Sequence, residues 1–188
     1  MSSGKRPSAG ELLVASAEQG HGFFEQTVVY LLDADESGAL GVVLNRLSEA
    51  ELYDVLPSWV PLVSPPQELF NGGPVSPNGA ICVARLANPS EEPPGWRRVS
   101  NDVGLLHLDT PTEIVSGAYA NLRIFAGYAG WEAGQLEGEL IRGDWHRVAA
   151  HDADLFGADQ SNLWRRVLRR QGGELAMLST WADDPDQN

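Results

Sequence analysis

Short apolar runs separated by glycine, proline and acidic turns recur through the first half of the chain. Runs of this length that are rich in β-branched residues and bounded by turn residues are typical of buried β-strands. They predict strands over residues 11–17, 27–32, 40–44 and 80–86. Residues 35–38 form a short acidic turn that ends in glycine, so the second and third strands are expected to pair as an antiparallel hairpin.

The second half mixes strand patterns with helical ones. Strands are predicted over residues 103–108, 122–126 and 145–149, and a last apolar segment, 175–179, closes the fold. Helical spacing or capping predicts helices over residues 48–56, 112–119, 131–141, 152–156 and 161–171. Ser48, Asp152 and Ser161 are the expected N-caps, since short polar side chains there accept hydrogen bonds from free backbone amides.

These elements do not alternate strictly between strand and helix. The predicted fold class is therefore α+β, with a mainly antiparallel sheet in a single domain. A proline-rich irregular connection over residues 57–66 and a loop over residues 88–95 interrupt the pattern, but neither divides the chain into parts with cores of their own. We expect one domain over residues 10–182, a disordered tail over residues 1–9 and a frayed end over residues 183–188.

The charge of the chain disfavours nucleic acid as a direct partner. Among 188 residues, 26 acidic side chains face 13 basic ones, a formal net charge of -13, whereas nucleic-acid binding depends on neutralising phosphates. Lys5 is the only lysine, and it lies in the predicted tail. Mechanisms that need a lysine inside the fold, such as a P-loop, a Schiff base or a Ser–Lys dyad, are thereby excluded.

The arginines gather in one predicted helix, residues 161–171. Its four arginines form the only notable cationic patch of the sequence: Arg165, Arg166, Arg169 and Arg170. The favoured interpretation is a solvated helix face, with the apolar residues Leu163, Trp164, Val167 and Leu168 packed inward. A docking site for an anionic partner is the second interpretation.

Conventional catalytic and metal-binding patterns are missing from the sequence. The four histidines lack metal-ligand spacing, and the single cysteine, Cys82, lies in an apolar strand where an inert buried thiol is expected. No metal, cofactor or catalytic residue is therefore predicted, although carboxylates that meet only in space would leave a hydrolase open. One cysteine, no signal-like segment and no long apolar run predict a cytoplasmic protein without a membrane span.

Two motifs of the first half are candidates for a ligand or partner surface. Gly72 and Gly73 precede a proline and predict a sharp turn, and their amides could alternatively hold an anion. Asn45 and Arg46 end a buried strand, where the asparagine can bond to backbone and the arginine can reach a carboxylate.

The candidate surface continues in the segment predicted as a helix over residues 131–141. Trp131, Gln135 and Glu139 are spaced four apart and would share one helix face, which could line a ligand pocket. The more favoured interpretation is a tryptophan packed on a sheet, with the polar pair capping or bracing a loop. Glu137 or Glu139 is the predicted partner of Arg46.

Four segments in a fixed order carry a family resemblance: residues 38–46 (GALGVVLNR), 71–75 (NGGPV), 125–131 (FAGYAGW) and 134–140 (GQLEGEL). Together they resemble the AlgH/YqgE family of bacterial proteins over nearly the whole chain. The resemblance implies an α+β fold with a bifurcated, barrel-like sheet surrounded by helices, and a cytosolic protein without an established activity. One branch of that family carries the label of a transcriptional regulator, without a recognised DNA-binding module.

The leading functional hypothesis is a non-enzymatic protein that acts by binding a protein or a small ligand. An indirect transcriptional regulator and an enzyme with a pocket around Trp131, Gln135 and Glu139 are the alternatives. If these motifs converge on one concave surface, they form a site; if they are dispersed, they are scaffold.

Overall fold

The computed structural model describes residues 4–17 and 22–180. Its strands are β1 (Glu11–Ala15), β2 (Val28–Asp35), β3 (Gly38–Val43), β4 (Phe70–Asn71), β5 (Val75–Leu86), β6 (Trp96–Ser100), β7 (Val103–Leu106), β8 (Tyr119–Glu132) and β9 (Trp145–Ala149). Its helices are α1 (Leu52–Val55), the 3-10 helix η1 (Pro57–Leu62), α2 (Thr112–Val115), α3 (Gln135–Arg142), α4 (Asp152–Phe156), α5 (Leu163–Gln171) and α6 (Gly173–Leu178). The tails predicted over residues 1–9 and 183–188 lie partly or wholly outside the described residues.

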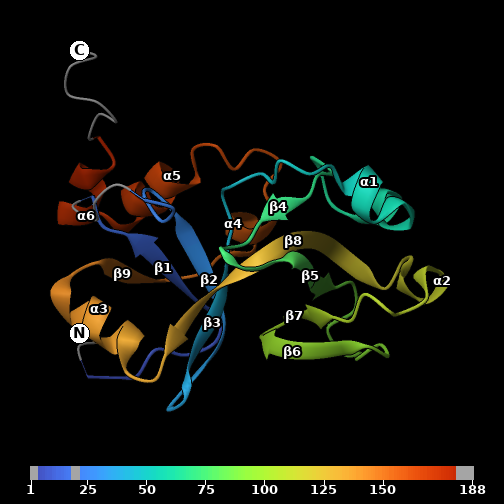
Figure 1. Ribbon diagram of the computed structural model, residues 1–188, viewed down its shortest axis with the longest axis horizontal. Coiled ribbons are helices and arrows are strands. Elements are labelled where there is room, and N and C mark those ends of the chain that lie inside the picture. Colours follow the sequence, from blue (N-terminus) through green and yellow to red (C-terminus); the bar gives the residue numbers. More distant parts are fainter. Residues whose placement is uncertain (1–3, 18–21, 181–188) are drawn as a thin grey trace.

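A single curled sheet organises the fold. Its strand order is β6-β7-β5-β8-β3-β2-β1-β9, with neighbours antiparallel, while β4 pairs in parallel with β8. The long strand β8 crosses the middle of the molecule (Figure 1), pairing with β5 along most of its length and with β3 at its end. The prediction of an α+β, mainly antiparallel, barrel-like sheet in one domain is confirmed.

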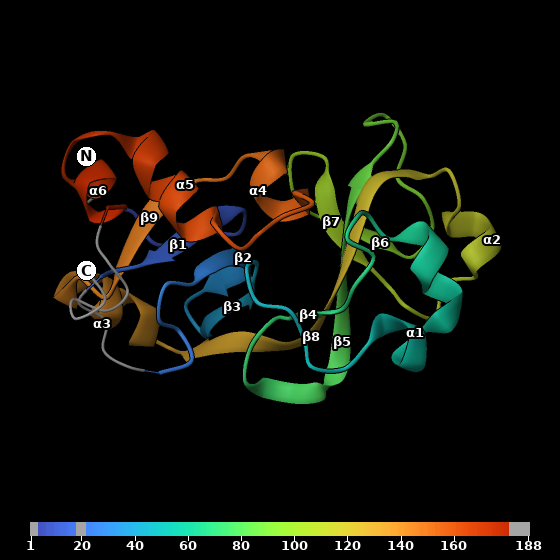
Figure 2. The same ribbon diagram turned by 90° about the horizontal axis from the view of Figure 1, so that it is seen from above.

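Helices lie at both ends of this sheet, beside β9 and β1 at one end and beside β5, β6 and β7 at the other. In Figure 2, α4, α5 and α6 lie over β1, β2 and β9, while α1 and α2 lie at the opposite end of the molecule. Strand β1 is buried on both faces: Leu12 and Val14 pack toward α5, and Leu13 and Ala15 pack toward the cluster that includes Trp145. This two-sided burial explains why the first strand reads as a continuous apolar run.

Several predicted elements are confirmed at residue level. Strand β9 and helix α4 have the predicted bounds, and β2 and β3 pair as the expected antiparallel hairpin. In α5 the four apolar residues of the predicted inner face are buried. Cys82 is buried in β5, and burial raises the pKa of its thiol, so it stays protonated at neutral pH.

Other predictions were wrong in type or extent. The predicted helix over residues 131–141 starts only at Gln135, because β8 runs on to Glu132 and Gly134, at φ +78°, turns the chain into α3. The helix expected over residues 112–119 stops at Val115, and part of the irregular 57–66 connection is the 3-10 helix η1. Strand β6 was not predicted at all.

The three expected N-caps were also wrong. Glu51, His151 and Asn162 hold these positions instead. The Ser48 hydroxyl accepts a hydrogen bond from the amide of Ala50, and the Ser161 hydroxyl donates to the carboxylate of Asp159. Each serine is thus engaged in a local turn just before its helix. Among the described residues, none of the helices has the length and apolar character needed to cross a membrane.

Candidate functional site

A groove of about 710 Å³ runs along strand β9. It is lined by residues 4–7, by helix α3 through Glu137, Leu140 and Ile141, by Trp145, His146 and Arg147 of β9, and by Leu175 of α6. We call it the β9 groove. Ile141, at its rim, is 87% exposed, the largest exposed fraction among the large apolar side chains of the described residues.

Arg147 builds one wall of this groove. Its Nε and Nη2 atoms donate to the two carboxylate oxygens of Glu11 at 2.9 and 2.8 Å. Its Nη1 atom also donates to the carbonyl oxygen of Lys5 at 2.5 Å, which holds the N-terminal segment against β9. Burial raises the pKa of Glu11, but the hydrogen bonds from Arg147 and Ser8 outweigh it and leave this pKa below its usual value.

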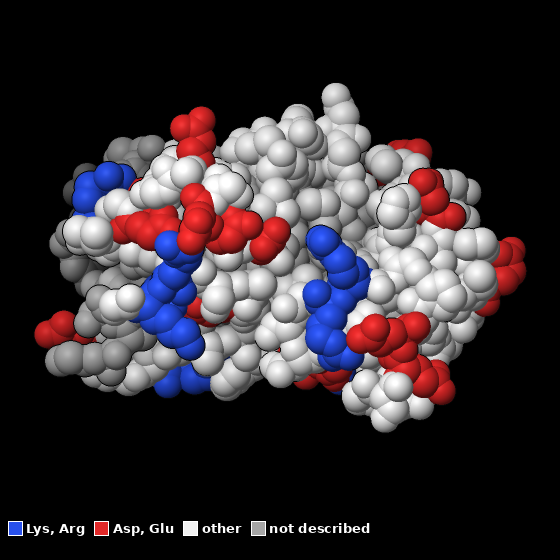
Figure 3. Space-filling model, turned by 90° about the horizontal axis from the view of Figure 1, so that it is seen from below, with Lys and Arg blue, Asp and Glu red and all other residues white. Residues whose placement is uncertain are grey.

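Basic groups outnumber acidic ones in the groove lining. Lys5, Arg6 and Arg147 line it, whereas Glu137 is the one acidic residue in that lining. Arg6 pairs with Glu36 at 3.4 Å, but both side chains are exposed, and such pairs contribute little. On the face in Figure 3, most of the surface is uncharged, and two short basic stripes are each bordered by acidic groups.

Trp145 forms the floor where β9 meets α3. Its ring packs edge-on against Trp131 and Phe24, with ring centroids 6.0 and 5.7 Å away. Its indole N–H donates to Oε1 of Glu139 at 3.3 Å. Within the described residues, Oε2 of Glu139 and Nε2 of His146 are buried without a hydrogen-bond partner. Burial also lowers the pKa of His146, which favours the neutral imidazole.

The predicted stripe of Trp131, Gln135 and Glu139 is not one helix face. Trp131 belongs to β8, where it is buried. The side-chain oxygen of Gln135 accepts a hydrogen bond from the amide of Glu132 at 2.9 Å and so braces the turn between β8 and α3. The interpretation favoured above, a packed tryptophan with a bracing polar pair, agrees with this geometry.

Asn45 and Arg46 brace the chain ahead of β2. Oδ1 of Asn45 accepts from the amide of Val28 at 3.0 Å, and its Nδ2 donates to the carbonyl of Gln26 at 2.9 Å. Arg46 donates to the carbonyl of Glu25 and lines two concavities, of about 310 and 490 Å³. The predicted pairing of Arg46 with Glu137 or Glu139 was wrong. Arg46 donates to backbone carbonyls instead, Glu139 accepts from Trp145, and Glu137 lines the β9 groove, which does not include Arg46.

The double glycine is a close-packing device. The amide of Gly72 donates to the carbonyl of Ala126 at 2.7 Å, and the amide of Gly73 donates to Oδ1 of Asn71 at 3.2 Å. Both donors are therefore used inside the protein and are not free to hold an anion. A Cβ on Gly72 would lie 2.4 Å from the carbonyl oxygen of Gly127, so β8 approaches too closely for a side chain.

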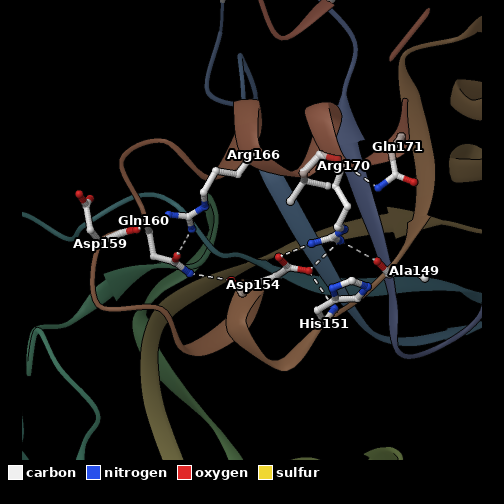
Figure 4. Close-up of polar contacts among 9 residues, drawn as sticks. Ala149, His151, Asp154, Asp159, Gln160, Arg166, Arg170 and Gln171 are labelled. Atoms are coloured by element: carbon white, nitrogen blue, oxygen red, sulfur yellow. Dashed lines mark hydrogen bonds and ion pairs between the residues drawn. The ribbon is translucent and has the colours of Figure 1, made fainter. Parts of the chain in front are cut away.

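Three of the four arginines on α5 brace their surroundings. In Figure 4, Arg170 reaches Asp154 of α4, with its two Nη atoms 2.8 and 3.0 Å from the carboxylate oxygens. Arg166 donates to the carbonyl of Asp159 at 3.0 Å, and Arg165 donates to the carbonyl of Ser179 at 2.7 Å.

Arg169, the fourth member, is exposed on the outer face of the helix. An anionic partner at this patch would have to compete with the contacts of its three neighbours. The patch therefore remains a weaker candidate than the β9 groove.

The motifs singled out by sequence fall into two places. Asn45, Arg46, Gly72 and Gly73 lie together, since the amide of Asn71 donates to the carbonyl of Arg46 and that of Val43 to the carbonyl of Gly72. Residues 131–139 lie at the β8–α3 turn, beside the groove. Glu137 is the only one of the eight candidate surface residues that lines the β9 groove.

Arg123 is a buried cation that the sequence did not mark. It is 1% exposed, donates to the carbonyls of Leu155 and Pro65 at 3.0 and 2.5 Å, and stacks over Phe70. Burial lowers its pKa to about 10. No group of three or more His, Cys, Asp or Glu in the described part of the chain is arranged to hold a metal ion.

Comparison with known proteins places this arrangement in one family. A family model described as AlgH-like matches residues 12–176. A UPF0301 protein of Streptomyces avermitilis is 47% identical over 182 residues, covering 95% of this chain and 94% of that protein. A UPF0301 protein of Mycobacterium tuberculosis is 40% identical over 186 residues, covering 98% and 92%.

Two solved structures are similar to the fold. A crystal structure of a Corynebacterium diphtheriae protein has a TM-score of 0.88 at 29% identity, covering 94% of each chain. The solution structure of AlgH from Pseudomonas aeruginosa has a TM-score of 0.68 at 30% identity, covering 93% of this chain and 94% of that one. With matching sequence motifs, fold and relatives over nearly its whole length, the chain belongs to the AlgH-like family.

Proposed function

We propose that this protein is a cytoplasmic, non-enzymatic binding protein whose ligand or partner occupies the β9 groove. The observation that carries the proposal is the combination of exposed apolar surface and basic side chains in one concavity. Ile141 and Leu140 offer apolar contact, and Lys5 and Arg6 offer positive charge, in a chain of net charge -13. Such a site favours a negatively charged ligand with an apolar part.

A regulatory effect on transcription would be indirect under this proposal. The formal charge of -13 opposes approach to DNA, and three of the four α5 arginines are engaged within the protein. Salt-sensitive DNA binding that is lost when all four α5 arginines are replaced would favour direct regulation instead.

The test is a titration of the isotope-labelled full chain with a library of small carboxylates and organic phosphates, followed by amide NMR shifts. We expect shifts to gather at Ile141, His146 and Arg147. The variant I141E should lose them, while the matched variant I114E, on exposed α2 at the other end of the molecule, should keep them. A library that shifts no groove residue, or shifts residues around Arg46 instead, would overturn the proposal.

A further inference from the structure

Strand β9 ends the sheet. It pairs with β1 on one side, and no other described strand pairs with its outer edge. An edge strand presents unpaired backbone N–H and C=O groups, which can take up a further strand from another polypeptide.

The groove follows this outer edge. Trp145, His146 and Arg147 are consecutive, and all three line it. Side chains on a strand alternate between the two faces of the sheet, so a cavity on one face would contact every second residue. Contact with three in a row therefore places the groove along the strand edge.

Apolar residues flank that edge on both faces of the sheet. On the face of Trp145 stands α3, whose Leu140 packs with the Trp145 cluster. On the other face, Leu175 of α6 packs against the cluster that contains Val148. An extended chain lying beside β9 would find apolar contacts above and below, as alternating side chains require.

The charge of the groove lining indicates which kind of extended peptide segment would bind there. Glu11 already neutralises Arg147 through two hydrogen bonds. Arg6 is paired only with the exposed Glu36 at 3.4 Å, a contact that a partner's carboxylate could replace at little cost. Lys5 and Arg6 are therefore the cations most available to a partner, against Glu137. Lys5 and Arg6 are adjacent on the segment that Arg147 holds in place. A partner with carboxylates on the side that faces this segment is complementary to the groove.

We infer that the β9 groove binds an extended, acidic segment of a partner polypeptide, which adds as a new strand beside β9; the inference rests on the proposed function of the same groove. The backbone of the segment pairs with the outer edge of β9. One of its apolar side chains rests on Ile141, and its carboxylates meet Lys5 and Arg6.

The test selects short random peptides displayed on phage against the full chain and measures the enriched peptides by fluorescence anisotropy. We expect enrichment of Asp and Glu in proline-free segments. The double variant K5E/R6E should weaken their binding about tenfold or more, since two attractive contacts become repulsive. The matched variant R97E/R98E, on exposed arginines of the opposite edge strand β6, should leave binding unchanged.

Backbone pairing is tested separately by N-methylation of the peptide. Methylation at alternate positions that face β9 removes the donors to the strand edge and should abolish binding, whereas methylation at the intervening positions should be tolerated. Peptides without an acidic excess, peptides that bind K5E/R6E equally well, or peptides insensitive to N-methylation would overturn the inference. If small anions bind the groove but no peptide does, the proposed function stands and strand addition falls.

Discussion

Replacing Gly73 by alanine should strongly destabilise the fold. Gly73 has φ +154°, and a Cβ built on it would lie 2.1 Å from the carbonyl carbon and oxygen of Tyr128 and 2.5 Å from the amide nitrogen of Ala129. All three atoms are backbone atoms of β8, the strand that joins the two parts of the sheet. They cannot move aside as the end of a flexible side chain could.

Two costs add up in this variant. The unfavourable φ for an alanine costs about 1–2 kcal/mol. Overpacking against fixed backbone costs roughly 1–3 kcal/mol more. The sum of about 2–5 kcal/mol should lower Tm by roughly 4–20 °C in a domain of this size, at about 2–4 °C for each kcal/mol.

Urea and thermal unfolding followed by circular dichroism measure this loss. The control is G138A on α3, where the nearest group to a new Cβ is the Arg142 side chain at 4.0 Å. Alanine there should stabilise the helix by about 1 kcal/mol. If G73A matched the wild type, or gained stability as G138A should, close packing against β8 would not be the reason for the double glycine.

Three further outcomes follow from buried groups. R170A leaves the Asp154 carboxylate, 7% exposed, without its ion partner and with only the amide of His151 as a donor. It should cost up to about 3–5 kcal/mol in urea unfolding, with R170K recovering part, and an unchanged midpoint would refute the contribution of this pair. R123M leaves the carbonyl of Leu155 without its buried donor, which should cost about 1–3 kcal/mol and lower the urea midpoint; equal stability would show that this hydrogen bond contributes little. Burial lowers the pKa of His146 below 6.5 in the folded protein. As the pH drops through 6.5, the unfolded chain therefore binds a proton that the folded protein does not yet bind, and the free energy of unfolding should fall by at most about 1.4 kcal/mol per pH unit. H146Q should flatten that slope, and an equally steep slope in H146Q would assign it to another group.

Hydrophobic pattern predicted the central strands well because their burial is two-sided. Residues 12–15 of β1 and 28–32 of β2 are apolar and buried without a break, so these runs stand out from the surrounding turns. Strand β6 was missed for the opposite reason. It lies at the sheet edge, and only Trp96 of its five residues is buried, its indole N–H bonded to the carbonyl of Ala84.

The boundary between β8 and α3 shows a second limit of pattern reading. Trp131 and Gln135 have helical spacing, but one lies in a strand and the other opens a helix. The change occurs at Gly134, whose positive φ redirects the chain. A spacing of four residues is equally compatible with one helix face and with a strand–turn–helix, since the pattern contains no information on φ.

The candidate site was largely hidden because its contacts are distant in sequence. Arg147 binds Glu11 and the carbonyl of Lys5 across 136 and 142 residues. Periodicity and motif spacing act over a few residues and cannot bring such groups together. The lysine count excluded lysine mechanisms inside the fold at the level of sequence, and we propose Lys5 for recognition at the rim of the β9 groove.

Most of the motifs that reveal the family lie outside the groove that we propose as its binding site; Glu137 and Leu140, from the motif over residues 134–140, are the ones that line it. Gly72, Gly73 and Asn45 are held where backbone segments approach closely, a demand that few residue types satisfy. A groove at a strand edge that binds a further strand requires only unpaired backbone groups, apolar side chains beside them and charge of one sign, which many residue types can supply. Experiments directed at Asn45, Gly72 and Gly73 should accordingly report on stability, while those directed at Lys5, Arg6 and Ile141 should report on binding with the fold intact.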